Sequence, residues 1–197
     1  MFEPFNTLFT STAVVALAEI GDKTQLLSFA LAARYRKSTP IILGILVATL
    51  LNHFAAAWLG QWLVSITADW FTPKQMKLAL AVSFIAMAIW LLVPDKLDEE
   101  GLNQRGSSIF VTTLVAFFIA EMGDKTQIAT VLLAAKTQFL SAVVIGTTLG
   151  MMIANVPAVI MGERLATRMN NPQLLRWVHR SAALIFVVIG IAIAIYA

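Results

Sequence analysis

Long apolar runs alternate with short polar breaks along this chain, and the runs are long enough to cross a lipid bilayer. A membrane-spanning helix needs about 20 residues. Six stretches reach or approach that length: 7–33, 39–62, 75–94, 108–135, 139–163 and 178–196. The clearest break between them is the polar linker 95–107. The pattern predicts an all-α integral membrane protein with six transmembrane helices.

The first and fourth runs are interrupted by nearly the same charged sequence. EIGDKTQ stands at 19–25 and EMGDKTQ at 121–127, a constant offset of 102 residues. The same offset relates glycines in the following spans, Gly44 to Gly146 and Gly60 to Gly162. An internal duplication explains these matches.

The duplication divides the chain into a first repeat, 1–94, the acidic linker 95–107, and a second repeat, 108–197. Each repeat holds three predicted spans. Because three is odd, the second repeat must run through the membrane in the opposite sense to the first. Such inverted repeats are related by a pseudo-two-fold axis in the membrane plane.

Composition supports the membrane assignment. Of the 197 residues, 59% are hydrophobic and 13% charged, and the mean hydropathy is +0.81. A soluble domain would be about half apolar and a quarter charged. There is no cysteine, which excludes disulfides and thiolate metal sites. The high pI, about 9.5, does not indicate a nucleic-acid partner, because the basic residues gather at the ends of the apolar runs.

The distribution of Lys and Arg predicts the orientation. One side of the bundle receives Arg34, Arg36, Lys37, Lys96, Arg105, Arg164, Arg168, Arg176 and Arg180, and the other receives Lys74, Lys77 and Lys136. Because cytoplasmic loops are enriched in Lys and Arg, the first side is predicted to be cytoplasmic. Both termini then lie outside, and we expect a multi-pass protein of the bacterial inner membrane.

Read as a helix, each motif places three polar side chains on one face, because they are spaced three apart. These are Glu19, Asp22 and Gln25 in the first copy and Glu121, Asp124 and Gln127 in the second. Both motif-bearing runs are longer than one crossing needs. A kink or unwound turn at Gly21 and Gly123 would accommodate the extra length and free backbone carbonyls to face a cavity.

Charges in the middle of a membrane must meet partners. Left unpaired, the four motif acids and the lysines Lys23 and Lys125 would cost on the order of 10 kcal/mol, comparable to the whole stability of a domain. The pseudo-two-fold axis would bring both motifs together near the membrane midplane. We therefore predict that the acids of the two copies converge on one site.

An all-oxygen site suits hard divalent cations. Two histidines and no thiol speak against zinc or copper, and Mg²⁺ loses its waters reluctantly, which leaves Mn²⁺ and Ca²⁺. Fully ionised, four acids and two lysines carry a charge of −2, which one divalent cation or two protons would neutralise. Since confined like charges favour protonated carboxyls, an empty site should take up protons and a cation should displace them.

Both motifs, read as E-x-G-D-K-T, resemble the signature of the calcium/cation antiporter-2 family, which includes the Golgi transmembrane protein 165 and bacterial MneA-type manganese exporters. The resemblance covers nearly the whole chain. It implies export of Mn²⁺ or Ca²⁺ from the cytosol, with proton antiport, and metal-binding roles for the motif acids. On the present chain these acids are Glu19, Asp22, Glu121 and Asp124. No cofactor is expected besides the transported cation, and the protein would act as a monomer or homodimer.

Several residues have two open interpretations. The four acids could form a structural ion-pair network instead of a metal site. Lys23 and Lys125 could balance charge or gate the site, or simply pair with neighbouring aspartates. Other polar residues could be metal ligands, could support the ligands, or could make hydrogen bonds between helices: Gln25, Gln127, Thr24, Thr126, Asn52, His53 and Asn155.

Two other functions compete with a secondary transporter. A divalent cation channel would share the buried acids but would need no proton coupling. An intramembrane aspartyl protease is more remote, because its G-x-G-D element has glycine where this chain has Glu19 and Glu121. No P-loop is present, so we expect ion gradients to drive transport.

Overall fold

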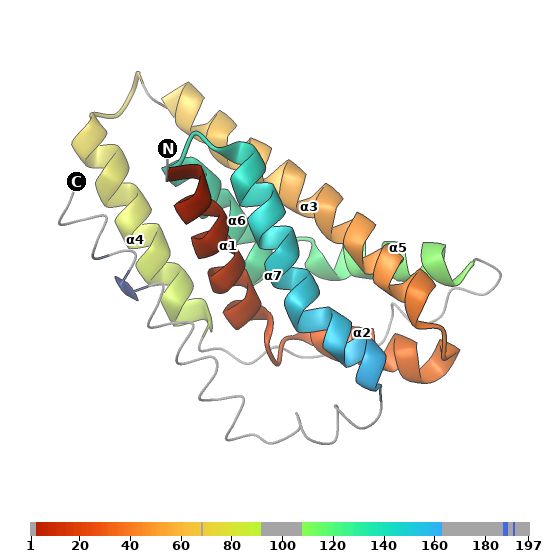
Figure 1. Ribbon diagram of the computed structural model, residues 1–197. Coiled ribbons are helices and arrows are strands. Elements are labelled where there is room, and N and C mark those ends of the chain that lie inside the picture. The colour runs from red at the N-terminus through yellow and green to blue at the C-terminus, as the bar shows by residue number, and fades with distance from the viewer. Residues whose placement is uncertain (1–2, 68, 92–107, 163–186, 189–190, 192–197) are drawn as a thin grey trace.

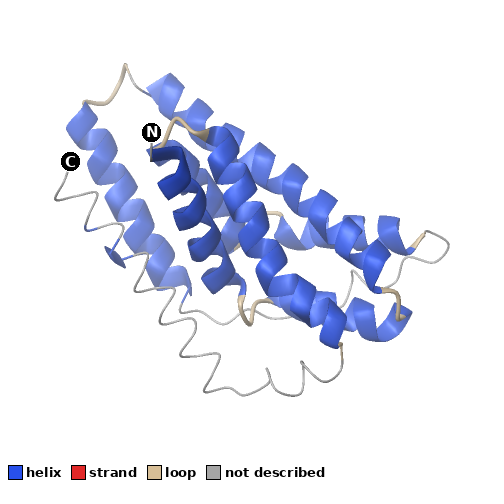
Figure 2. Cartoon of the chain, viewed as in Figure 1, coloured by secondary structure: helices blue, strands red, loops and turns tan. Residues whose placement is uncertain are grey.

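The computed structural model describes residues 3–67, 69–91, 108–162, 187–188 and 191, and every regular element within these ranges is an α-helix (Figures 1 and 2). The helices bounded in the structure are α1 (Glu3–Glu19), α2 (Lys23–Tyr35), α3 (Ser38–Thr67), α4 (Pro73–Leu91), α5 (Ile109–Glu121), α6 (Lys125–Lys136) and α7 (Leu140–Met161).

The second, third and fifth predicted spans correspond to α3, α4 and α7. The first span is divided into α1 and α2, and the fourth into α5 and α6. The predicted linker 95–107 and nearly all of the sixth predicted span, 178–196, lie outside the described residues.

Both divided spans break at the motif glycines. Gly21 has a φ of 85° and Gly123 a φ of 72°, a left-handed conformation that glycine adopts readily and other residues avoid. The prediction of an unwound turn at the motif is therefore confirmed. The prediction of one continuous helical face is wrong, because Asp22 and Asp124 are extended N-cap residues, with ψ of 167° and 165°.

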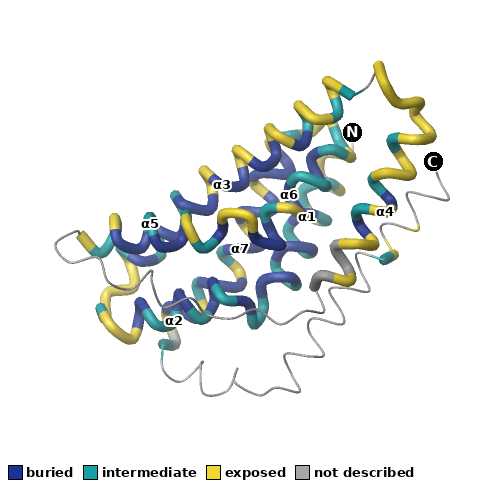
Figure 3. Tube along the Cα trace, turned by 180° about the vertical axis from the view of Figure 1, so that it is seen from behind, coloured by how far each residue is buried: buried dark blue, intermediate teal, exposed yellow. Residues whose placement is uncertain are grey.

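The longest helices have a small, partly polar inner face and a bulky apolar outer face. On α3 the buried positions recur every three or four residues: Ile41, Gly44, Ile45, Ala48, Thr49, Asn52, His53, Ala56, Ala57 and Gly60. Its outer face exposes Leu50, Phe54 and Trp58, and Figure 3 shows this alternation along the helix. By length and composition, α3 and residues 140–160 of α7 could cross a membrane.

Glycines bring the two halves into close contact at equivalent places. A Cβ atom on Gly44 of α3 would lie 2.8 Å from Thr113 Cβ on α5. A Cβ atom on Gly146 of α7 would lie 2.9 Å from Ser11 Cβ on α1 and 2.6 Å from the Leu8 carbonyl oxygen. Thr113 follows Ser11 by the same 102 residues that separate the two glycines. One contact therefore occurs twice, with the halves exchanged.

Two apolar clusters, each built from residues of both halves, lie on either side of the motifs. The first, here called the N-side layer, contains Val14, Ala18, Ala57, Phe84, Ala129, Leu133, Ala134, Val143 and Val144. The second, here called the opposite layer, contains Leu27, Leu31, Ala32, Ile41, Ile45, Ala48, Ala116, Phe117 and Val159. Along both divided spans, the motif falls between residues of one layer and residues of the other.

Candidate metal centre

Three motif carboxylates meet in the interior of the helical bundle. One oxygen from each of Glu19, Asp22 and Asp124 lies within 4.8 Å of the others. All three side chains are buried, Glu19 completely. Two oxygens that share a cation lie at most about 5 Å apart, twice a metal–oxygen distance of about 2.3–2.6 Å. The spacing therefore fits coordination of one cation by both motifs.

The broken helices aim the aspartates at this cluster. Asp22 and Asp124 occupy the N-cap positions of α2 and α6, yet neither carboxylate accepts a capping hydrogen bond from its helix. An N-cap bond is typically worth about 1 kcal/mol. Both copies forgo it, which leaves these oxygens turned toward the cluster.

Glutamines four residues after the glycines support the break. The Gly21 backbone N–H donates to Gln25 Oε1 at 2.7 Å, and the Gly123 N–H donates to Gln127 Oε1 at 2.7 Å. Gln25 Nε2 also donates to the Ala154 carbonyl of α7 at 2.7 Å. The Oε1 atoms of Gln25 and Gln127 therefore hold the two unwound turns in place.

Lys23 links the two motifs. Its ammonium lies 2.8 Å from Asp124 Oδ1, so the lysine of the first copy pairs with the aspartate of the second. Lys125, the equivalent lysine, is 3% exposed. The pairing of Lys23 could not be read from sequence, because the nearest aspartate along the chain is Asp22.

Glu121 stands beside the three-carboxylate cluster with its own partners. Thr126 Oγ1 donates to Glu121 Oε2 at 3.1 Å and also lies 3.4 Å from Asp124 Oδ2. His53 Nε2 of α3 lies 3.9 Å from the same Glu121 oxygen. The four acids are therefore all buried, but only three of them form the tight cluster.

Asn155 of α7 is the counterpart of His53. Its Nδ2 donates to Glu19 Oε1 at 3.3 Å, and its Oδ1 accepts a hydrogen bond from Ser28 Oγ at 2.7 Å. Each motif glutamate thus meets a polar residue from a helix of the other half. Asn52 donates its side-chain amide to the Phe118 carbonyl of α5 at 3.2 Å.

The sequence interpretation missed Ser28, which holds Asn155 in position. A signal was present, because Ser28 and Thr130 are hydroxyl residues inside apolar helices at the same 102-residue offset. Thr130 Oγ1 instead donates to the Thr126 carbonyl at 2.8 Å. The matched polar positions therefore extend about one helical turn beyond each motif.

Several buried oxygens around the cluster retain unused hydrogen-bonding capacity. Glu19 Oε2, Thr24 Oγ1 and Glu121 Oε1 have no hydrogen-bond partner among the described residues. Buried polar groups are rarely left unsatisfied, since each costs about 1–3 kcal/mol. These atoms are suited to bind a proton, a water molecule or a cation.

Comparisons with known proteins agree with this chemistry. A family model described as "Divalent cation/proton antiporter GDT1" matches residues 7–99 and 109–197. A Vibrio cholerae protein named "Putative manganese exporter" is 55% identical over 166 residues, covering 83% of this chain and 80% of that protein. "GDT1-like protein sll0615" of Synechocystis is 27% identical over 184 residues, covering 84% and 87%.

The rice "GDT1-like protein 4" is 28% identical over 193 residues, which covers 85% of this chain and 66% of the relative. No solved structure matches the chain. The family match spans both halves and both copies of the motif. The chain therefore belongs to the GDT1 family of divalent cation/proton antiporters, and it is a membrane transporter and not an enzyme.

Proposed function

We propose that the protein exports a divalent cation from the cytosol in exchange for protons, with Mn²⁺ as the first candidate and Ca²⁺ as the second. One observation carries the proposal: buried carboxylates from both motifs lie close enough to share an ion. A buried group of this kind costs several kcal/mol unless its charge is balanced. A cation or protons can supply that balance in turn.

Glu19, Asp22 and Asp124 would bind the cation directly. Glu121, held by Thr126 and close to His53, would accept a proton or join the ligands when the bundle rearranges. Three ionised carboxylates and the Lys23 ammonium leave two negative charges, which one divalent cation or two protons would balance. The same site is thereby suited to both transported species.

Mn²⁺ is preferred over Ca²⁺ for two reasons. The cluster offers a small number of carboxylate oxygens, and Ca²⁺ takes six to eight oxygen ligands. The Vibrio relative carries the name "Putative manganese exporter". Mn²⁺ takes six oxygen ligands, which is the lower end of the Ca²⁺ range.

The proposed architecture is a pair of inverted repeats, 1–94 and 108–197, joined by a cytoplasmic linker, with six membrane crossings in total. The matched contacts of Gly44 and Gly146 support it, as do the two equivalent apolar layers. Following the Lys and Arg distribution, the start of α1 and the end of α6 would face the outside of a bacterial inner membrane.

Flux measurements in proteoliposomes test the function. The wild type should move Mn²⁺ faster when the proton concentration is higher on the side toward which Mn²⁺ moves, because protons then flow in the opposite direction. A Mn²⁺ gradient should in turn drive protons the other way. Glu19→Gln and Asp124→Asn should reduce the flux at least tenfold. Asp69→Asn is the matched control, because Asp69 is an exposed carboxylate between α3 and α4.

Two results would overturn the proposal. Equal flux with and without the pH gradient would identify a channel instead of an exchanger. Normal exchange by Glu19→Gln and Asp124→Asn would show that the cation binds elsewhere.

A further inference from the structure

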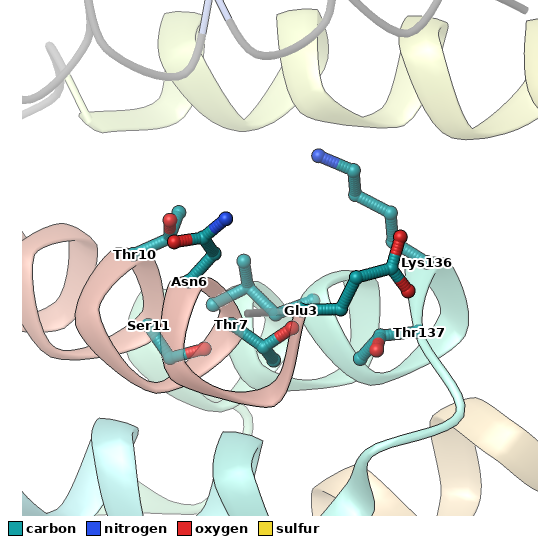
Figure 4. Close-up of a pocket in the computed structure, with 8 residues that line it drawn as sticks. Glu3, Asn6, Thr7, Thr10, Ser11, Lys136 and Thr137 are labelled. Carbon is teal, nitrogen blue, oxygen red and sulfur yellow. The ribbon is translucent and has the colours of Figure 1, made fainter. Parts of the chain in front are cut away.

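A cavity of about 270 Å³ opens between the start of α1 and the end of α6, away from the carboxylate cluster. Its polar wall includes Glu3, Asn6, Thr7, Thr10, Ser11 and Lys136 (Figure 4). The five α1 residues recur at i, i+3, i+4, i+7 and i+8, so they form one polar stripe on one face of the helix. An apolar transmembrane helix has no structural need for such a stripe.

The most buried residue of the stripe, Ser11, has a hydroxyl that is available to bind a polar ligand. Ser11 is fully buried, and its hydroxyl makes no hydrogen bond within the described parts of the chain. The mouth carries one charge of each sign, on Glu3 and Lys136, so it would not trap a cation tightly. The volume also suffices for a hydrated ion, because six waters occupy about 180 Å³ at roughly 30 Å³ each.

The face of α1 that carries the stripe continues toward the carboxylate cluster but becomes apolar. Below Ser11 the same face presents Val14 and Ala18, and then the helix ends at Glu19. Glu19 follows Ser11 by eight positions, which is about 12 Å along the helix axis. Val14 and Ala18 pack with Leu133 of α6 in the N-side layer, and Leu133 also lines the cavity. This layer therefore separates the cavity from the cluster.

The equivalent place on the other side of the cluster is built differently. Ser11 and its counterpart Thr113 each pack against a glycine of the other half, but Thr113 donates its hydroxyl to the Ile109 carbonyl at 2.8 Å. The opposite layer supplies Leu31 where the N-side layer has Leu133. Among the described residues, the hydroxyl is thus unpaired at Ser11 and paired within its own helix at Thr113.

We propose that the cavity is a transit site for a hydrated divalent cation on the N-terminal side of the membrane, and that Val14, Ala18 and Leu133 form the gate between it and the carboxylate cluster. The opposite layer, at Leu31 and Ala116, is the corresponding gate on the other side. In the conformation described here the N-terminal mouth is open while both layers are closed. The inference rests on the proposed transport function and adds to it the path and the gates.

The absence of cysteine from the sequence makes a direct test possible. Thr10→Cys places a thiol on the cavity wall, and Phe5→Cys places one on the outer face of the same helix, where Phe5 is 72% exposed. Each variant is reconstituted and treated from the N-terminal side with a membrane-impermeant, cationic methanethiosulfonate. Mn²⁺ flux is compared before and after treatment of the same preparation.

Modification of Thr10→Cys should lower the Mn²⁺ flux at least tenfold, whereas Phe5→Cys should lose less than twofold. Val14→Cys, at a buried gate position, should react at least tenfold faster during Mn²⁺ transport than at rest. Full flux in modified Thr10→Cys, or equal reaction rates for Val14→Cys in both conditions, would overturn the assignment. Thr137→Cys, on the α6 wall, repeats the flux test if Thr10→Cys does not fold.

The outcome is separable from that of the proposed function. If the unmodified protein shows no proton-coupled flux, the exchanger proposal fails. If coupled flux is intact but modification of the cavity leaves it unchanged, only the transit site fails.

Discussion

Replacing Gly123 with alanine tests whether the helix break depends on a left-handed glycine. Gly123 has a φ of 72°, and a Cβ atom built there meets nothing within 4 Å. The substitution therefore adds no clash, and its whole effect is conformational. A left-handed conformation costs a residue with a side chain about 1–2 kcal/mol. In a chain of this length each kcal/mol lowers the melting temperature by about 2–4 °C, so we expect a fall of about 2–8 °C.

The assay is thermal unfolding of the purified protein in detergent, followed by tryptophan fluorescence at a fixed scan rate. Asparagine enters the left-handed region more easily than alanine, so Gly123→Asn should lose less than Gly123→Ala. Gly146 supplies the contrasting case. It is helical, and a Cβ there would lie 2.6 Å from the Leu8 carbonyl oxygen. Adding side-chain atoms at a packed contact costs about 1–3 kcal/mol. At position 146 asparagine, which is larger, should therefore lower the melting temperature more than alanine.

The reversed order at the two glycines is the informative result. If alanine and asparagine at position 123 lower the melting temperature equally, the left-handed backbone does not explain the glycine. If Gly123→Ala leaves the melting temperature unchanged, the break itself is in doubt.

Three further substitutions test the contacts around the cluster. Lys23→Met removes the ammonium 2.8 Å from Asp124, so the site gains one net negative charge. We expect tighter Mn²⁺ binding, with the Kd measured by calorimetry lowered about tenfold or more. A raised Kd would contradict this. Asn155→Leu removes the hydrogen bonds of Asn155 to Glu19 and Ser28 and should destabilise the protein by about 1–3 kcal/mol. Asn155→His should retain more of the Mn²⁺ flux than Asn155→Leu, because histidine fills the matched position beside Glu121. Equal flux in both variants would refute the role of Asn155. Gln25→Leu should lower the melting temperature more than Gln25→Glu, since only glutamate keeps an acceptor for the Gly21 N–H. Both variants lose the donor to the Ala154 carbonyl, so the reverse order would show that the bond to the Gly21 N–H does not stabilise the break.

The sequence predicted the helical class and the break at each motif, because both depend on local chemistry. Apolar runs of membrane length and a glycine followed by an aspartate are visible without any tertiary information. The exact start of α2 and α6 was not predictable from spacing, since Asp22 and Asp124 fit a helical face and an N-cap position equally well. The 102-residue offset placed His53 and Asn155 at matched positions, and in the structure each lies beside a motif glutamate.

The sequence predicted that the two motifs meet, but not which side chains pair across the halves. Pairing of Lys23 with Asp124, and the separate partners of Glu121, depend on how α1, α3, α6 and α7 pack around the break. The cavity was missed for a different reason. The stripe of Glu3, Asn6, Thr7, Thr10 and Ser11 is readable at helical spacing, but its meaning depends on Leu133 and Lys136 facing it from α6.

The most direct test of the account is the number of Mn²⁺ ions bound by the purified protein, counted by electron paramagnetic resonance together with the protons released. The two motifs are proposed to build one site, so the wild type should bind one Mn²⁺ per chain and release about two protons. Asp22→Asn or Asp124→Asn alone should abolish that binding. Two ions per wild-type chain, or one ion retained by each single variant, would show that the motifs bind cations separately and would contradict the shared site.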